Sequence, residues 1–265
     1  MLIRELKYIK NVVLFRLFGL FRSISPNAKK IKKLKDTKIE KRCFITATGP
    51  SLTSKDLEML KDEDTFGVNS IFLMYDKTDW RPTYYVCTDA PYFKKLVDSY
   101  GITPDMLCKQ DIFLNSQTRK LNPSFKEDKI HWISFSGWNR AYDFYKPQIM
   151  DDISHGMFAF GTVTNIVIAI AMYMGYKEIY LIGADCSNLN QHFVNDVTDK
   201  DKDDAYVKKV IHAQLAGYEI MKKETEKRGV GVYNVTRGGA LEVFPRKDLD
   251  VVLDKQIFLN KEIIK

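Results

Sequence analysis

The stretch that decides the fold is Val163-Thr-Asn-Ile-Val-Ile-Ala-Ile-Ala-Met-Tyr-Met174, followed by Gly175 and then by Glu178-Ile-Tyr-Leu-Ile-Gly183. The first segment is apolar almost throughout and long enough for a buried helix, and Gly175 is placed to end that helix with a glycine C-cap. The second segment is a short apolar run of strand length that closes on Asp185. A buried helix followed by a buried strand is typical of an α/β domain with a parallel sheet.

On both sides of this unit, short apolar runs alternate with helical patterns along most of the chain. The sequence predicts further strands at 42–48, 65–69, 83–88, 111–114, 130–135 and 230–235, and helices from Ser54, over 91–100 and over 205–228. This alternation predicts one Rossmann-like, doubly wound α/β domain with a mostly parallel sheet.

The charge of the chain is concentrated in an N-terminal arm. The net charge is +7 over 265 residues, but residues 1–42 hold 13 Lys/Arg against 3 Asp/Glu, so the remainder is slightly acidic. A body without a basic surface gives no reason to expect nucleic-acid binding.

Apolar residues in this arm recur at helical spacing, namely Leu2, Leu6, Ile9, Val13, Leu17, Leu20 and Ile24. A lysine cluster follows between Lys29 and Lys35. This pattern predicts an amphipathic helix that lies on an anionic membrane surface through residues 1–35. Repeated charges such as Arg16 argue against a membrane-spanning helix, and no small-residue cleavage site indicates a signal peptide. The alternatives are a helix packed on the body or in a homo-oligomer interface.

Four scattered cysteines without a CxxC pair indicate neither a zinc site nor a disulfide framework, so a reducing cytoplasmic setting fits best. Together with the arm, this predicts a cytoplasmic protein that is peripheral on the inner face of the cell membrane.

Small and polar residues follow the predicted strands, at the sheet edge where ligands of open parallel sheets bind. They are Thr48, Gly49, Pro50 and Ser51 after the first strand, Asn69 and Ser70 after the second, Asp89 after the third, Asp185, Ser187 and His192 after the buried unit, and Arg237 after the last. A glycine turn that opens a helix can present backbone N–H groups to a phosphate. Neither GxGxxG nor a Walker loop is present, so no motif indicates NAD or ATP.

No pair of the four histidines has the spacing of a metal site, and the run of Asp199, Asp201 and Asp203 is typical of a solvated charge run. We therefore expect no metal and no cofactor. His131 lies inside a strand pattern, whereas His155, His192 and His212 are candidates for a role in the cleft.

Several of these segments carry a family resemblance. Gly49-Pro-Ser-Leu52, Asn69 and Ala169-Ile-Ala-Met-Tyr-Met-Gly-Tyr-Lys-Glu-Ile-Tyr-Leu-Ile-Gly-Ala-Asp185 resemble bacterial sialyltransferases of glycosyltransferase family 42. They also resemble a wider group with flagellin-modifying motility accessory factors and an archaeal hydroxymethylpterin pyrophosphokinase, to which Pro82-Thr-Tyr-Tyr-Val-Cys-Thr-Asp89 is similar. The resemblance covers roughly residues 42–240.

The resemblance implies a metal-independent transfer of sialic acid, or a related acidic sugar, from a CMP-activated donor to a surface glycan, either free or lipid-linked. It implies that Gly49, Pro50 and Ser51 form the nucleotide turn and that Asn69 faces the phosphate. An ungapped count back from Tyr233 aligns His212 with the family's general base. A neutral imidazole suits this role, because it can accept a proton from the acceptor hydroxyl. Residues 1–41 would then be the arm and linker, and residues 42–265 the catalytic domain with a lid around 188–211.

Two positions depart from the family pattern. Where the family has two tyrosines that bind the leaving phosphate, this chain has Ser187 and Phe193, and His192 is the available substitute donor. His155, Gly161 and Thr162 occupy the region of the family's acceptor site, where the family's arginine has no clear counterpart. Gly161 and Thr162 are nevertheless assigned to the donor site, and His155 and Arg237 are acceptor or secondary candidates. Two other functions stay open: an ATP- and Mg²⁺-dependent pyrophosphokinase-like enzyme with Asp89 and Asp185 as ligands, and a non-enzymatic membrane-associated nucleotide-binding protein.

Overall fold

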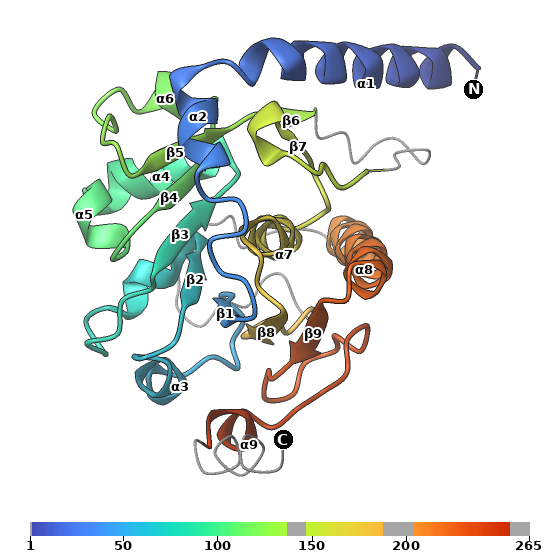
Figure 1. Ribbon diagram of the computed structural model, residues 1–265. Coiled ribbons are helices and arrows are strands. Elements are labelled where there is room, and N and C mark those ends of the chain that lie inside the picture. Colours follow the sequence, from blue (N-terminus) through green and yellow to red (C-terminus); the bar gives the residue numbers. More distant parts are fainter. Residues whose placement is uncertain (1, 137–146, 188–203, 255–265) are drawn as a thin grey trace.

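The computed structural model describes residues 2–136, 147–187 and 204–254 (Figure 1). A seven-stranded sheet lies at its centre, and all neighbouring strands in it are parallel. Its strands are β1 (Arg42–Thr46), β2 (Thr65–Val68), β3 (Tyr84–Cys87), β4 (Ile112–Asn115), β5 (Ile130–Ile133), β8 (Glu178–Ile182) and β9 (Gly231–Asn234).

The strand order in this sheet is β5-β4-β3-β2-β1-β8-β9. From β1 the chain adds strands to one side as far as β5, and it then returns to the other side of β1 with β8 and β9. The order therefore reverses between β1 and β8, which is the switch point where ligands bind in doubly wound sheets. The Rossmann-like, doubly wound architecture predicted from the sequence is confirmed.

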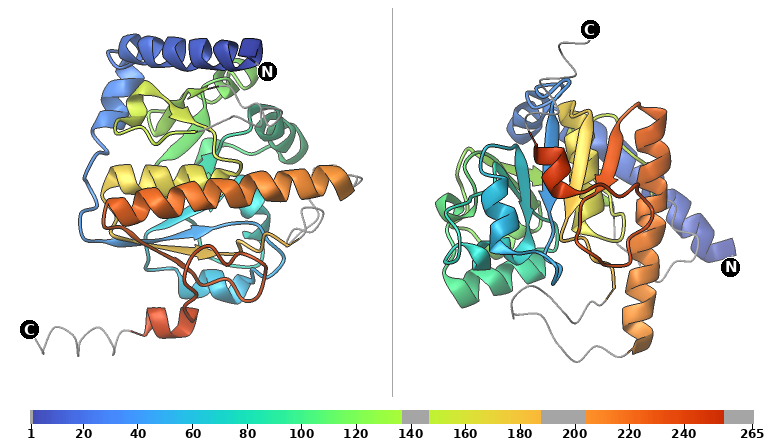
Figure 2. Two further views of the ribbon diagram at one scale, coloured as in Figure 1. Left: turned by 90° about the vertical axis from the view of Figure 1, so that its right-hand side faces the viewer. Right: turned by 90° about the horizontal axis from the view of Figure 1, so that it is seen from below.

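Helices cover both faces of the sheet (Figure 2). On one face, apolar residues of α2 (Pro26–Lys32), α7 (Val163–Met174) and α8 (Asp204–Lys227) share a core with the strands. On the other face a second core includes residues of α3 (Ser54–Met59), the 3₁₀ helix η1 (Asn69–Met74), α4 (Ala90–Tyr100), α5 (Pro104–Leu107) and α9 (Leu249–Leu253). Successive residues of a strand contribute to opposite cores, as Cys43 and Phe44 do, because side chains alternate across a strand.

The helix–strand unit forms as its sequence predicts. Helix α7 begins at Val163, ends at Met174, and is capped by Gly175 in the left-handed conformation at φ 95°. Most of its side chains are buried, because the helix packs against both the sheet and α8. Strand β8 then pairs with β1 along its whole length.

The structure corrects two expected element boundaries. Thr53, not Ser54, is the N-cap of α3, because the Thr53 hydroxyl accepts from the Asp56 N–H while the Asp56 carboxylate accepts from the Thr53 N–H. The strand expected over 130–135 breaks at Ser134. Phe135–Ser136 instead forms β6, which pairs with β7 (Met157–Phe158) in a separate small sheet. The 3₁₀ helix η2 (Ile153–His155) lies between β6 and β7 along the chain, and the short helix α6 (Thr118–Leu121) lies between β4 and β5.

Part of the expected lysine-rich linker is a helix that belongs to the body. Ala28 and Ile31 of α2 are each only 1% exposed. The Asn27 side chain donates to the Trp132 carbonyl and accepts from the Trp132 N–H, both at 2.9 Å, so α2 occupies backbone groups of the edge strand β5. Further along, the N–H groups of Asp36 and Lys38 donate to the carbonyls of Tyr173 and Met174 at the end of α7.

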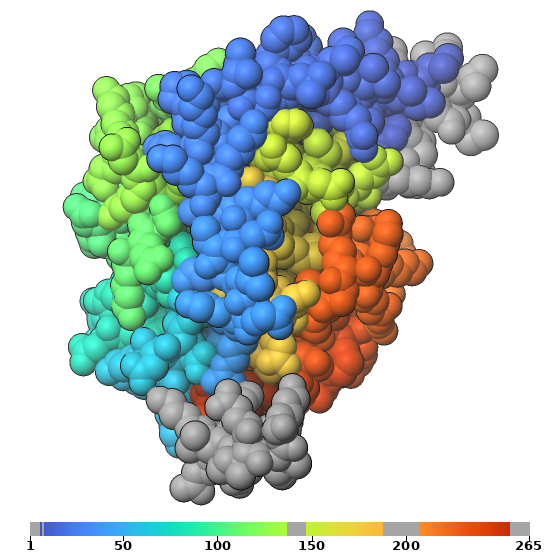
Figure 3. Space-filling view, viewed as in Figure 1, coloured from blue at the N-terminus to red at the C-terminus, as the bar shows by residue number. Residues whose placement is uncertain are grey.

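Helix α1 (Leu2–Arg22) precedes α2 and extends beyond the body (Figures 1 and 3). It contacts η2 and β6 near its C-terminal end. Among the helices that the structure describes, none combines the length and the apolar character needed to cross a lipid bilayer. The predicted N-terminal helix is thus present, and part of it is packed on the body.

The docking of α2 gives a test of stability. Because Ile31 lies in the core beside α7, Ile31→Ala should lower the free energy of unfolding by about 2–4 kcal/mol. Lys33→Ala, on an exposed side chain two residues along, should stay within about 0.5 kcal/mol of the wild type. Urea denaturation of both variants measures the difference. An unchanged midpoint for Ile31→Ala would mean that this segment is an open linker.

Candidate functional site

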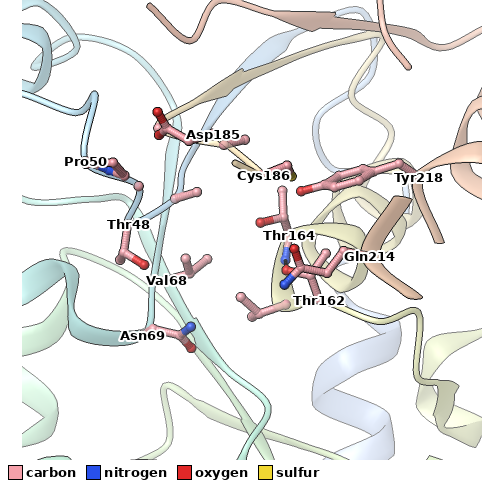
Figure 4. Close-up of a pocket in the computed structure, with 15 residues that line it drawn as sticks. Thr48, Pro50, Val68, Asn69, Thr162, Thr164, Asp185, Cys186, Gln214 and Tyr218 are labelled. Carbon is pink, nitrogen blue, oxygen red and sulfur yellow. Dashed lines mark hydrogen bonds between the residues drawn. The ribbon is translucent and has the colours of Figure 1, made fainter. Parts of the chain in front are cut away.

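One pocket lies at the switch point of the sheet, between two facing walls (Figure 4). The first wall consists of the segments that leave the C-terminal ends of β1, β2 and β8. The second consists of the N-terminal end of α7 and the side of α8. The lining residues are Ala47, Thr48, Gly49, Pro50, Val68, Asn69, Thr162, Val163, Thr164, Gly183, Ala184, Asp185, Cys186, Gln214 and Tyr218.

The first wall depends on a close approach between Gly49 and Asp185. A Cβ atom at Gly49 would lie 1.9 Å from Asp185 Oδ2 and 2.5 Å from the Gly183 carbonyl oxygen, so only glycine fits there. The Gly49 N–H donates to that Gly183 carbonyl at 2.8 Å, and the Ser51 hydroxyl donates to Asp185 Oδ2 at 2.8 Å. Asp185 is 7% exposed, and this exposed part faces the pocket.

Two non-glycine residues of this wall have left-handed backbone conformations. Asn69 has φ 51°, and its carbonyl accepts a 2.6 Å hydrogen bond from the Tyr85 hydroxyl. Cys186 has φ 52°. Asparagine tolerates this region well, whereas cysteine does so at a cost, and such strain is common at functional sites.

The second wall presents the N-terminus of a helix to the pocket. Thr162 is the N-cap of α7, and Val163 and Thr164 of its first turn also line the pocket. The Tyr218 side chain, on α8, lies on the same side of the pocket as Thr162 and Thr164 (Figure 4). Unpaired N–H groups and the positive end of the helix dipole make such a terminus favourable for an anion.

Helix α8 is pressed against the segment before α7. A Cβ at Gly217 would lie 2.0 Å from the Phe160 carbonyl oxygen, and one at Gly161 would lie 2.4 Å from the Ala213 carbonyl oxygen. The buried Asn165 amide donates to the Phe160 carbonyl at 2.7 Å and to the Gln214 carbonyl at 3.4 Å. These contacts fix Gln214 and Tyr218 over the N-terminus of α7.

Burial keeps the two other titratable groups of the pocket neutral. It raises the pKa of the Cys186 thiol to about 11, although the hydrogen bond with Tyr218 acts in the opposite direction. Burial also raises the pKa of the Tyr218 phenol well above its ordinary value. Cys186 is therefore a thiol, not a nucleophilic thiolate, at neutral pH, and Tyr218 is a neutral hydrogen-bonding group.

The structure brings together six of the residues predicted for the donor site, namely Thr48, Gly49, Pro50, Asn69, Thr162 and Asp185. Ser51 does not line the pocket but positions Asp185. The other described candidates lie outside the lining: Ser70 is buried in η1, Gly161 packs on α8, Ser187 is exposed, and Asp89 caps α4 by accepting from the Tyr92 N–H. His192, Phe193 and the first part of the expected lid lie outside the described residues.

The three remaining candidates do not line this pocket. His212 is exposed on α8; because it is two residues before Gln214, it lies roughly 160° around the helix from that side chain. His155 lies in η2, 3.4 Å from an Asp152 oxygen and beneath α1. Arg237 pairs at 3.0 Å with Asp56, which is 2% exposed. The roles predicted for these three residues stay predictions.

The sequence reasoning missed Thr164, Cys186, Gln214 and Tyr218 as lining residues. Gln214 and Tyr218 are four residues apart and so share one face of α8, which the sequence does show. Which face of that helix turns toward α7 is decided by Gly161 and Gly217, whose partners are distant in sequence. Within residues 2–136, 147–187 and 204–254, no three His, Cys, Asp or Glu side chains gather as metal ligands would.

A comparison with protein families matches residues 20–191 to the family described as 6-hydroxymethylpterin diphosphokinase MptE-like. The chain belongs to this MptE-like family. The match contains β1, β2, α7 and β8, and therefore most of the pocket of this MptE-like protein. A comparison with curated proteins finds no match.

Among solved structures, the MptE-like chain is similar to the MAf glycosyltransferase from Magnetospirillum magneticum AMB-1, with 13% identity and a TM-score of 0.51. The match covers 84% of this chain but only 37% of that much longer one. The sialyltransferase CstII from Campylobacter jejuni, determined in complex with cytidine-5'-monophosphate, also matches, with 16% identity, a TM-score of 0.48 and coverage of 78% of this chain and 85% of that one. At this level of identity the likeness to the MAf enzyme establishes the shared fold.

Because of the contact at Gly217, we expect Gly→Ala at this helix position to destabilise the protein, although the same substitution usually stabilises a helix. In an unconstrained helix Gly→Ala is stabilising by about 0.5–1 kcal/mol. Here the added methyl would meet the Phe160 carbonyl, so Gly217→Ala should instead lower the free energy of unfolding by about 1–3 kcal/mol. Ala216→Ser, at the exposed neighbouring position, is the control and should have little effect. Stabilisation by Gly217→Ala in chemical denaturation would show that α8 is not held against this segment.

Proposed function

We propose that this protein is a glycosyltransferase that transfers sialic acid, or a related acidic sugar, from a CMP-activated donor to a surface-glycan acceptor. The observation that carries the proposal is the pocket at the switch point, where the N-terminus of a twelve-residue helix faces a wall of turns that follow three parallel strands.

The second wall would hold the phosphate of the donor. The first-turn N–H groups of α7 and the hydroxyls of Thr162 and Thr164 are all hydrogen-bond donors, and the helix dipole favours negative charge there. Cytidine monophosphate gains charge as it leaves the sugar. Donors that already point at that charge stabilise the transition state more than the ground state, and they do so without a metal.

The first wall would hold the nucleoside. The carboxylate of Asp185, a lining residue whose Oδ2 lies beside Gly49 and Ser51, can accept further hydrogen bonds from ribose hydroxyls or a base amino group. It would also repel a phosphate. The donor is therefore expected to lie with its phosphate toward α7 and its nucleoside toward Asp185, with Asn69 and Gln214 at either side.

The choice of CMP and an acidic sugar is supported by the sequence resemblance of Gly49-Pro-Ser-Leu52, Asn69 and the 169–185 segment to sialyltransferases of family 42. The fold shared with the MAf glycosyltransferase agrees with glycosyl transfer. We place the reaction in surface polysaccharide synthesis at the inner face of the bacterial cell membrane, where a lipid-linked acceptor would be accessible.

His212 is the proposed general base. In the reaction, its imidazole would take the proton of an acceptor hydroxyl, the oxygen would bond to the anomeric carbon, and the bond from that carbon to the phosphate would break with inversion. This role comes from the resemblance. Because His212 is exposed on the outer side of α8, the acceptor would have to approach over α8, or the N-terminal turns of α8 would have to rotate toward the pocket.

The family description favours a second candidate, a diphosphokinase-type transfer from ATP. That reaction requires Mg²⁺, for which Asp89 and Asp185 are the expected ligands. Asp185 lines the pocket, but Asp89 is exposed at the N-terminus of α4 and does not. The placement of these two carboxylates therefore favours the first proposal.

Nucleotide binding discriminates between the proposals. Thermal unfolding in the presence of CMP, UMP or ATP, each with Mg²⁺ or with EDTA, should show stabilisation by CMP that EDTA does not remove. Stabilisation by ATP and Mg²⁺ alone would favour the diphosphokinase. No stabilisation by any nucleotide would favour a non-enzymatic protein.

A matched pair of variants locates the phosphate. Thr164→Val, on the first turn of α7, should weaken CMP binding about tenfold through the loss of one hydroxyl donor. Thr225→Val also removes a buried hydroxyl, one that donates to the Lys222 carbonyl at 2.9 Å outside the pocket lining, and it should leave affinity unchanged. Equal effects of the two substitutions in calorimetry would argue against a phosphate at α7.

The base is tested by His212→Ala. Since the base must be neutral to accept a proton, the rate should fall at low pH in the wild type, and this acid limb should vanish in the variant together with about 10²–10⁴ of the turnover. Nucleotide affinity should be preserved. Lys223→Ala, at an exposed position of α8 about three turns beyond His212, is the control and should retain turnover. A His212→Ala enzyme with normal turnover and pH profile would exclude this base.

A further inference from the structure

Among the described residues, helix α1 is attached to the body by one side. On that side Phe15 packs edge-on against Phe158 with ring centroids 5.6 Å apart, and Val12 contacts the same core. The Arg22 guanidinium lies 4.6 Å above the Phe15 ring and donates to the His155 carbonyl at 2.7 Å. Gly19 is buried against the same carbonyl, from which an added Cβ would be 3.0 Å away. These contacts give α1 a defined orientation relative to the body.

The opposite side of α1 is an apolar surface that nothing in the described structure covers. We define the outward stripe as the exposed residues Leu6, Ile9, Val13, Leu17, Leu20 and Phe21. Their exposed fractions run from 49% at Val13 to 72% at Phe21. At about 100° per residue, the outward stripe centres roughly opposite Val12, Phe15 and Gly19. The helix therefore has two apolar sides, and in the described part of the chain only one of them has a partner.

The charge around this surface identifies its partner. Lys10 lies at the border of the outward stripe, Lys29, Lys33 and Lys35 are exposed just beyond it along the chain, and residues 1–42 carry a balance of +10. A long helix with an apolar side and many cations, but without the character of a membrane span, is typical of helices that lie in the interface of an anionic bilayer. A second copy fits less well, because an isologous contact would bring two strongly basic segments together.

We propose that the outward stripe of α1 inserts into the interface of an anionic lipid bilayer and holds the body in a fixed orientation to that surface. The N-terminal end of α1 points to the same side of the molecule as the N-terminal end of α8 (Figure 2). Docking through Phe15 and Arg22 makes this a rigid attachment, not a tether.

Vesicle flotation of the full chain tests the proposal without any substrate. The wild type should float with vesicles of phosphatidylcholine and phosphatidylglycerol, and much less with phosphatidylcholine alone or in high salt. The double variant Leu17→Ser/Phe21→Ser should reduce the partition coefficient at least about tenfold. Substitutions are preferable to deletion of the arm, because Ile31 belongs to the core.

The matched control is Leu121→Ser/Val251→Ser, which removes two exposed apolar side chains from α6 and α9 and should float as the wild type does. Both double variants alter exposed positions, and thermal unfolding confirms that each is folded.

Flotation of Leu17→Ser/Phe21→Ser equal to that of the wild type would overturn the proposal, as would a wild type that does not float. A wild type that dimerises through this stripe without floating would assign the surface to a second copy. Because flotation needs no donor and nucleotide binding needs no membrane, the proposed function and this inference can fail separately.

Discussion

Strand β1 pairs with β8 in parallel along its whole length, from Arg42 opposite Glu178 to Thr46 opposite Ile182. The two strands are more than a hundred residues apart in the sequence, yet their pairing places Gly49 directly against Asp185 and the Gly183 carbonyl. The same pairing leaves a gap in the helix layers, because the chain leaves β1 toward one side of the sheet and returns on the other. The pocket is the consequence of this reversal, and its glycines are what allow the two strand ends to approach each other.

Secondary structure is predicted best from the sequence where a segment is buried on nearly all sides. Helix α7 and β8 are buried on nearly all sides, so their side chains form continuous apolar runs whose lengths alone distinguish helix from strand. The residues after the strand ends were predictable for the same reason, since the C-terminal edge of a parallel sheet follows from the strand pattern. The break at Ser134 and the docking of α2 were not. Asn27 pairs with the backbone of Trp132, and nothing in the local pattern of either segment shows that partner.

The second wall of the pocket could also not be predicted from the sequence alone. Gln214 and Tyr218 lie on the same face of α8 as the buried Val210 and Met221, so the pattern indicates which face is buried but leaves the choice of its partner open. The choice is made by Gly161 and Gly217, which let the backbones of α8 and the 160–165 segment come within contact distance. A glycine in a helix interior has a cost of about 1 kcal/mol, which indicates a packing reason but does not name the partner. The orientation of His212 away from the pocket is set by the same contact.

The apolar pattern of α1 has two different physical origins that the sequence merges into one signal. Phe15 and Val12 are apolar because they pack on the body, whereas Leu17 and Leu20 are apolar and exposed, without a partner among residues 2–136, 147–187 and 204–254. A helix that only needed to dock would show the first set and would carry polar residues elsewhere. The second set, six exposed residues surrounded by cations, makes the isolated protein less soluble and contributes nothing to its core. A surface that is unfavourable in water is a physical reason to expect a partner, and the proposed insertion of the outward stripe into an anionic bilayer would supply one.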